Sequence, residues 1–193
     1  MSLNETKFDL MSDLRIDETT ELSAIDEMIK GESKYVRDLR INVKNAVQSE
    51  NISLKEAYLI ALGVSVNEKN KVLIKSFTTL ATEHDATEAE IAEVYACTSL
   101  LSVNNVFYRF RHFVEKESYQ NMPARIKMNI MMNPVLGKEF FELLSLVISA
   151  VNGCEQCVKS HESSVIKLGS SEARIFDAIR LGAIIRGLSQ VVN

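Results

Sequence analysis

The stretch VNEKNKVLIKSFTTLATEHDATEAEIAEVYACTSLL, residues 66–101, carries the pattern that decides the fold. Its apolar residues recur at spacings of three and four, as Ile91 and Val94 do, and this is the period of an amphipathic helix. Thr87, followed three residues later by Glu90, forms a capping box that marks a helix start. Because alternating strand patterns are scarce elsewhere in the chain, these features predict an all-α fold.

A second stretch, VNGCEQCVKSHESSVIKLGSSEARIFDAIRLGAII at residues 151–185, repeats this rhythm. Asn67 matches Asn152, and the offset is about 85 residues before Thr82 and 84 after it, which one inserted residue explains. We therefore expect an internal duplication. A degenerate first repeat would span about 55–105, and a second repeat of about 137–190 would carry the chemistry.

We expect only the second repeat to carry the chemistry. In the register that pairs Asn67 with Asn152, the first repeat has inert residues where the second has two cysteines and a histidine. The three inert residues are Lys69, Val72 and Ser76, and their counterparts are Cys154, Cys157 and His161. One half therefore resembles a scaffold and the other a reactive site.

Other boundaries follow from turn residues and caps. Asn133, Pro134 and Gly137 form the clearest helix break, just before the second repeat. Ser171 is a weaker helix start, because Arg174 stands where a capping box needs Glu or Gln. The first fifty residues predict one or two polar amphipathic helices packed on the outside.

Composition narrows the class of protein. Hydrophobic residues make up 46% of the 193, enough for a core that needs no metal or disulfide to fold. A net charge of −4 gives no electrostatic footprint for nucleic acid. The polar N-terminus shows no secretion signal, and the longest apolar run, 143–151, is too short to span a bilayer. These features predict a cytoplasmic protein that does not enter the membrane.

The motif NGCEQCVKSHE, residues 152–162, carries the chemistry. A helix opening near Cys154 would place Cys157 and His161, four residues apart, on one face, with Cys154 two turns from His161. A thiol in the first helical turn faces the positive end of the helix dipole, which favours thiolate, and an adjacent imidazole can exchange its proton. The three cysteines of the chain leave one over, which argues against a structural disulfide framework.

Of four interpretations of the motif, three remain open. A structural zinc site has four protein ligands, so a fourth would have to come from Glu142 or Glu162. Covalent haem attachment through C-x-x-C-H is excluded because Val158 follows the second cysteine. An inert buried pair is a third reading. A dithiol–disulfide redox couple is the leading one, with no tightly bound cofactor and no metal.

The other residues that could carry chemistry are expected to have structural roles. Cys97 lies in an apolar run and is expected to be a small core residue. We expect His84 in a solvated loop and His112 in a structural role. The methionines of 127–132 are expected to fill the core, and the aromatic run 107–113 suits helix packing or a subunit interface.

The chain resembles a known family in three runs: NNVFYRFRHFVEK at 104–116, ARIKMNIMMNP at 124–134 and FELLSLVISAVNGCEQCVKSHE at 141–162. These are similar to the alkyl hydroperoxide reductase D (AhpD) family of the carboxymuconolactone decarboxylase-like superfamily. The signature E-x11-C-x-x-C-x3-H, from Glu142 to His161, is specific.

The resemblance implies one all-helical AhpD-like domain over residues 1–193, with an internal repeat, assembled as a homotrimer. It implies a thiol-dependent peroxidase and disulfide reductase in antioxidant defence. Its CxxC pair would pass electrons from dihydrolipoamide, carried by the lipoyl-bearing acyltransferase of a 2-oxoacid dehydrogenase, to the peroxiredoxin AhpC.

The resemblance also implies roles for individual residues. Cys157 would be the activated thiol and Cys154 its more exposed partner, with His161 and Glu142 forming a proton relay, partly through water. The helix dipole favours Cys154 as the attacking thiol, whereas the relay favours Cys157, and we follow the relay. Gln156 stands where well-studied members have histidine. Glutamine can substitute in a hydrogen-bonded relay but cannot titrate.

Two other functions stay open from the sequence. The pair could serve as a redox sensor or a stress-response binding protein without significant peroxidase turnover. Decarboxylase chemistry, which names the superfamily, does not call for a CxxC pair.

We predict that Cys154 and Cys157 form a reversible disulfide, because their spacing places both thiols at one helix end. Peptide mapping after mild peroxide treatment should find this link, and dithiothreitol should remove it. A dominant disulfide that contains Cys97 would contradict the prediction.

Overall fold

The computed structural model describes residues 2–193, and these contain helices and no strand, as the sequence predicts. In chain order the α-helices are α1 Leu3–Asp13, α2 Ser23–Lys30, α3 Tyr35–Val47, α4 Leu54–Asn67, α5 Lys71–Glu83, α6 Glu88–Val114, α7 Glu117–Asn121, α8 Lys138–Val151, α9 Glu155–Lys167 and α10 Glu172–Ser189, with a short 3-10 helix at Asn129–Met131. None of the described helices is long and apolar enough to cross a membrane.

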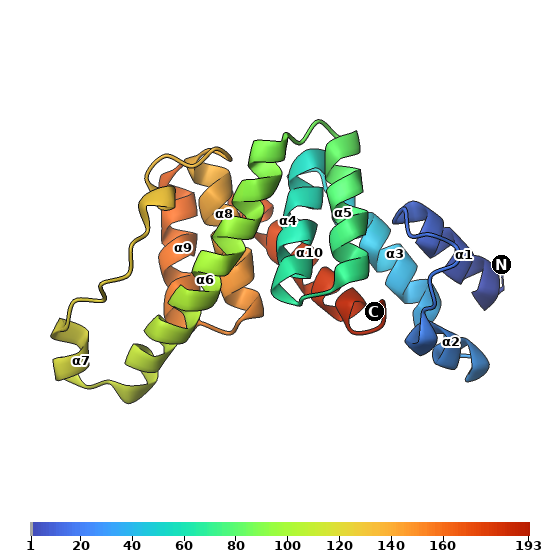
Figure 1. The fold of residues 1–193 in the computed structure, drawn as a ribbon, viewed down its shortest axis with the longest axis horizontal. Coiled ribbons are helices and arrows are strands. Elements are labelled where there is room, and N and C mark those ends of the chain that lie inside the picture. Colours follow the sequence, from blue (N-terminus) through green and yellow to red (C-terminus); the bar gives the residue numbers. More distant parts are fainter. Residues whose placement is uncertain (1) are drawn as a thin grey trace.

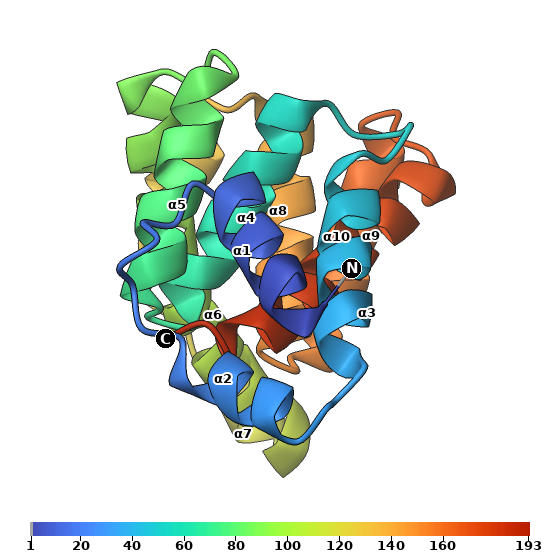
Figure 2. The same ribbon diagram turned by 90° about the vertical axis from the view of Figure 1, so that its right-hand side faces the viewer.

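Figure 1 shows how these helices are arranged. Helices α1–α3 form one end, α4, α5 and α10 the middle, and α8 and α9 the other end, with α6 running diagonally across. The view along the long axis in Figure 2 places α1 in front of α4 and α8. The first fifty residues form three helices rather than the expected one or two, because the turns at 14–22 and 31–34 break the segment twice.

The helix starts follow the capping signals. Thr87 accepts a hydrogen bond from the backbone of Glu90, whose side chain bonds back to Thr87, so the predicted capping box is confirmed. Ser171 accepts a bond from the Arg174 backbone without a reciprocal bond, as the weaker start predicts. The break before α8 is also confirmed. Gly137 precedes that helix with a φ of 78°, a conformation that side chains other than glycine rarely adopt.

The helix spacing repeats along the chain. Helices α4, α5 and α6 begin at residues 54, 71 and 88, and α8, α9 and α10 begin at 138, 155 and 172, each 84 residues later. The register expected before Thr82 is therefore wrong by one residue. Cys154 corresponds to Asn70 rather than Lys69, and both residues cap a helix N-terminus. By the same spacing Cys157 corresponds to Leu73 and His161 to Phe77. Duplication itself stays a prediction.

Two buried acids tie the halves together in matching ways. Glu93 on α6 accepts hydrogen bonds from the backbone N–H groups of Val135 and Leu136, at 2.9 and 2.6 Å, just before α8. Asp177, 84 residues later on α10, accepts bonds from Ser49 and Asn51, at 2.8 and 2.7 Å, just before α4. Each acid on the third helix of one half therefore holds the segment that enters the first helix of the other.

Helix α8 lies at the centre of this arrangement. It contacts α4, α6, α9 and α10 and is buried over most of its length. Glycines let two of these neighbours approach it closely. A Cβ atom at Gly182 of α10 would lie 2.5 Å from Cγ1 of Val147, and one at Gly63 of α4 would lie 2.8 Å from Cδ1 of Leu144. The close approach of α4 and α10 to α8 thus depends on the lack of a side chain at Gly63 and Gly182.

We predict that Gly182→Ala destabilises the fold. The added methyl group would overlap the buried, β-branched side chain of Val147, and overpacking of this kind costs about 1–3 kcal/mol, partly offset by the better helix propensity of alanine. Thermal unfolding followed by circular dichroism measures the effect. Gly187→Ala on the same helix is the matched control, because a Cβ there meets nothing within 4 Å. Equal melting temperatures for the two variants would contradict the prediction.

Candidate functional site

The cysteine pair lies at the turn between α8 and α9. Gly153 makes this turn with a φ of 68°, and the backbone N–H of Cys154 donates to the carbonyl oxygen of Ser149 at 3.1 Å. Cys154 is the N-cap of α9, where the sequence expected the helix to open. The two sulfur atoms are bonded at 2.03 Å, with the Cα atoms 5.3 Å apart. The pair is therefore held at the positive end of the α9 dipole.

The two cysteines differ in exposure, and in the opposite sense to the one the resemblance implied. In this disulfide form Cys154 is 0% exposed and Cys157 is 7% exposed, so Cys154 is not the more exposed partner. Helix α6 lies over the turn that precedes Cys154: Arg109 donates to the Asn152 carbonyl at 2.7 Å. Cys157, one turn into α9, faces a pocket instead. Of the two cysteines, only Cys157 lines this pocket.

Glu142 and His161 form a direct pair. Nδ1 of His161 on α9 lies 2.7 Å from Oε2 of Glu142 on α8, with side-chain exposures of 11% and 18%. An ionised carboxylate only accepts hydrogen bonds, so Nδ1 carries the proton and Nε2 is left to exchange one. The link that the resemblance gave as partly through water is direct at this step. His161 and Cys157 also line the same pocket.

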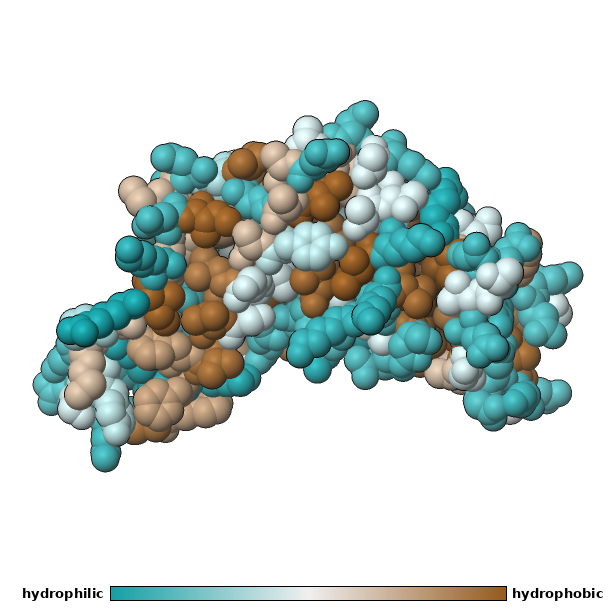
Figure 3. Space-filling view, viewed as in Figure 1, coloured by the Kyte–Doolittle hydropathy of each residue, from teal (hydrophilic) through white to brown (hydrophobic). Residues whose placement is uncertain are grey.

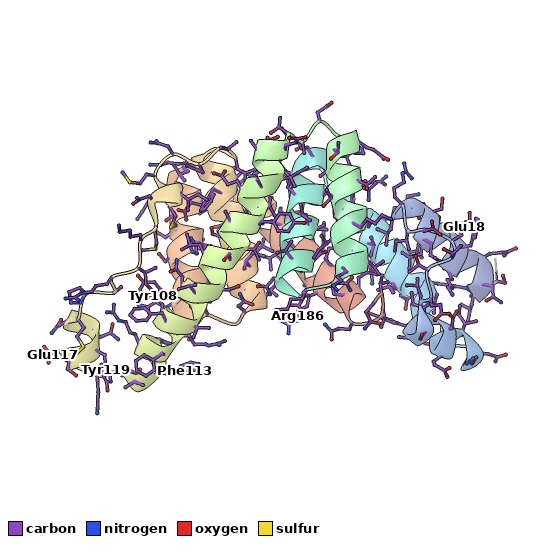
Figure 4. All side chains as sticks on the ribbon, in the orientation of Figure 1. Glu18, Tyr108, Phe113, Glu117, Tyr119 and Arg186 are labelled. Atoms are coloured by element: carbon purple, nitrogen blue, oxygen red, sulfur yellow. A yellow bond between two sulfur atoms is a disulfide. The ribbon has the colours of Figure 1, made fainter. Side chains whose placement is uncertain are left out.

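The pocket has a volume of about 360 Å³. It is lined by α9, by α6 and by the segment around the 3-10 helix, through Gln156, Cys157, Ser160, His161, Asn104, Tyr108, Met128 and Met131. Figure 4 shows Tyr108 on the side of α6 that faces the extended segment returning from α7. Apolar walls and a few polar groups beside a reactive pair are typical of a small-molecule site.

Five of the lining residues were not predicted as site residues, and all of them except Ser160 lie outside the cysteine motif. Asn104, Tyr108, Met128 and Met131 come from two segments that meet the cysteines only through the path of α6 and α7 in space. Met131 packs against the core as expected, but Met128 is half-buried in the pocket wall and Met132 is exposed, so the methionines of 127–132 fill the core only in part. Sequence spacing carried no signal for this contact.

The other titratable candidates lie outside the pocket. Cys97 is fully buried beside Ser145, and burial raises the pKa of its thiol to about 12, so its reading as a core residue is confirmed. His84 lies in the turn after α5, as expected, but it is half-buried rather than solvated. It ends α5, bonds to the Leu80 carbonyl at 2.8 Å and packs on the Tyr58 ring. Nε2 of His112 lies 3.3 Å from a carboxylate oxygen of Glu155.

A larger and more open hollow, of about 820 Å³, lies between residues 12–20 and the start of α5. Its lining contains no cysteine and no histidine, so it offers none of the redox chemistry considered above. Within residues 2–193, no three His, Cys, Asp or Glu side chains are grouped so that they could hold a metal ion. The reactive groups converge at the smaller pocket.

The chain is similar to known proteins over most of its length. The model of the carboxymuconolactone decarboxylase family matches residues 117–193. Alkyl hydroperoxide reductase AhpD of Coxiella burnetii (strain RSA 493 / Nine Mile phase I) is 36% identical over 160 residues, covering 81% of this chain and 90% of the relative. AhpD of Anaeromyxobacter dehalogenans (strain 2CP-C) is 34% identical over 164 residues, covering 85% and 88%. The protein of that name from Rhodopseudomonas palustris (strain BisB18) is 33% identical over 166 residues, covering 86% and 91%.

We predict that Glu142→Gln slows alkylation of reduced Cys157 near pH 7 by up to about 100-fold. Loss of the carboxylate makes the protonated, imidazolium form of His161 less favourable. Because less imidazolium is then present to stabilise the Cys157 thiolate, the pKa of the thiol rises. The rate should recover at a pH above that raised pKa. Mass spectrometry across a pH series measures the profile.

Two further variants sharpen this test. His161→Gln should shift the profile in the same way, and the double variant should lose little more, because the two side chains act as one unit. Glu139→Gln is the matched control one turn earlier on α8, where the carboxylate pairs with Arg174 at 3.0 Å. An unshifted profile for Glu142→Gln would remove Glu142 from the relay.

Proposed function

The chain belongs to the AhpD family of the carboxymuconolactone decarboxylase-like superfamily, and from that membership we propose that it acts as an alkyl hydroperoxide reductase of the dithiol type. Its electron donor would be dihydrolipoamide on a 2-oxoacid dehydrogenase acyltransferase, and its acceptor the peroxiredoxin AhpC. The observation that supports this most is the pocket in which the disulfide sulfur of Cys157 lies beside the His161–Glu142 pair.

The reductive half-reaction is a pair of thiol–disulfide exchanges. A lipoyl thiolate attacks Sγ of Cys157, the Cys154–Cys157 bond breaks, and Cys154 leaves as a thiolate at the helix N-terminus. The second lipoyl thiolate then attacks the lipoyl sulfur of the mixed disulfide and displaces Cys157. Two electrons pass to the cysteine pair, and the lipoyl group is oxidised to its cyclic disulfide. His161 takes up and returns the protons that these thiols release and need.

The oxidative half-reaction reverses the roles. The Cys157 thiolate attacks the AhpC disulfide, and Cys154 resolves the mixed disulfide, so the cysteine pair is oxidised and AhpC is reduced. Access favours Cys157 over Cys154 as the attacking sulfur, because Cys154 is enclosed while Cys157 opens on the pocket. The helix dipole is then left to stabilise Cys154 as the leaving thiolate.

We propose a homotrimer on the basis of family membership and of one exposed face. Val103, Val106, Phe110 and Phe113 are 50%, 62%, 47% and 72% exposed, and their spacing places them in one stripe along α6. Apolar and aromatic residues gather over this part of the surface in Figure 3, and Figure 4 places Phe113 and Tyr119 at the far tip of the molecule. A stripe of this kind is typical of a protein–protein interface.

The catalytic proposal predicts peroxide-dependent NADH oxidation in a reconstituted system. The mixture contains a lipoyl domain, its NADH-dependent reductase, AhpC, an alkyl hydroperoxide and this protein, and each component is omitted in turn. Cys154→Ser and Cys157→Ser should abolish turnover, whereas Cys97→Ala, a core substitution outside the pocket, should retain it. If the pair is oxidised and reduced but no turnover occurs, the redox-sensor function replaces the proposal.

The assembly proposal predicts a mass of three times the 21.7 kDa of one chain in light scattering. Phe113→Glu places a charge in the apolar stripe and should weaken assembly. Phe8→Glu, on α1 at the opposite end, changes a similarly exposed ring and is the control. A wild-type mass of one chain would refute the trimer.

A further inference from the structure

Asn104 is a buried amide with one unsatisfied end. Its side chain lies on α6 in the wall of the cysteine pocket, and the residue is 5% exposed. Nδ2 donates to the sulfur of Met128 at 3.3 Å, which is a weak acceptor. Oδ1 has no hydrogen-bond donor among the described residues. Buried polar atoms are nearly always paired, so an unpaired oxygen on a residue that lines the pocket points to a ligand.

The next residue shows what a structural asparagine looks like in this fold. Asn105 is 1% exposed, and both ends of its amide are used. Its Nδ2 donates to Ser149 at 2.9 Å, and its Oδ1 accepts from Asn152 at 2.9 Å. Asn105 therefore ties α6 to α8 and to the turn before the cysteines. Asn104 makes no comparable tie, although it is buried to a similar degree.

The rest of the wall limits what can meet this oxygen. Tyr108, Met128 and Met131 make much of the wall apolar, so a charged ligand would lose hydration without gaining an opposite charge from them. A free oxygen lone pair requires an N–H or O–H donor. The chemistry that fits is a neutral, flexible apolar chain with one hydrogen-bond donor, whose reactive end reaches Cys157.

We propose that Oδ1 of Asn104 accepts a hydrogen bond from the amide N–H of the dithiol substrate, which makes Asn104 a specificity-determining residue. The proposal rests on the function inferred above, in which the lipoyl chain ends in an amide. A site that pairs a buried oxygen with a substrate N–H rejects an analogue without that hydrogen, because the oxygen is then left unpaired in the complex. The pocket would thus select amide-linked dithiols.

Binding can be measured without any redox reaction. The disulfide form of the protein is titrated with lipoamide or methyl lipoate, two neutral cyclic disulfides of which only the amide carries an N–H, and NMR chemical shifts report the affinity. The wild type should bind the amide roughly tenfold more tightly. Asn104→Leu should abolish this preference, whereas Asn104→Asp should keep it because it retains an acceptor oxygen. Cys97→Ala, a core substitution outside the pocket, should leave the preference in place.

The same pair of compounds, in reduced form, gives a kinetic arm. The ratio of kcat/KM for dihydrolipoamide over its methyl ester should fall about tenfold in Asn104→Leu and stay near the wild-type ratio in Asn104→Asp. A substitution that merely damaged the fold would lower both rates together. If binding retains its preference but neither dithiol is turned over, the proposed function fails and the amide subsite stands.

Thermal stability tests the proposal for Asn104 independently. Asn104→Leu removes a buried, half-satisfied amide, so its melting temperature should equal or exceed that of the wild type. Asn105→Leu breaks two hydrogen bonds and should melt at a lower temperature. Three results would each overturn the proposal: an unchanged amide preference in Asn104→Leu, loss of the preference in Asn104→Asp as well, or a fall in melting temperature in Asn104→Leu as large as that in Asn105→Leu.

Discussion

The packing of α8 between four other helices is the constraint on which the rest of the structure depends. Glycines at 63 and 182 let α4 and α10 come within side-chain contact of α8, which is buried along most of its length. A helix enclosed in this way cannot rotate or slide without opening cavities. Glu142, which α8 carries, therefore arrives at one place, and so does the turn at Gly153 that starts α9.

The chemistry of the site follows from that fixed geometry. A carboxylate held 2.7 Å from an imidazole, with little water around either group, interacts more strongly than an exposed pair would. The same burial encloses Cys154 at the N-cap of α9 and leaves Cys157 facing the pocket. In the proposed reaction, one sulfur leaves as an anion and the other meets the incoming partner. The two cysteines of a single CxxC pair would thus have different roles in disulfide exchange.

The matched contacts of the two halves suggest how a reactive site is supported. Glu93 and Asp177 each hold the entrance to the first helix of the opposite half. Lys55 with Glu90, and Glu139 with Arg174, form ion pairs at corresponding positions with the charges reversed. At the positions of Cys157 and His161 the first half has Leu73 and Phe77, which are fully buried. Apolar core residues of the first half thus occupy the positions that correspond to the reactive groups of the second half.

The sequence by itself determined the helical class, the capped starts at Thr87 and Ser171, the break before α8, and the motif from Glu142 to His161. These are local properties, because periodicity, capping and turn residues act over a few neighbouring positions. Only the tertiary structure decided the exposure of the two cysteines, the place of His84 and the pocket wall formed by Asn104 and Met128. The one-residue error in the repeat register has the same origin. The register was set by the similar residues around Asn67 and Asn152, whereas the true helix ends are known only from the folded structure. Burial and contact between distant segments depend on how whole helices cross, and no short pattern of residues encodes that angle.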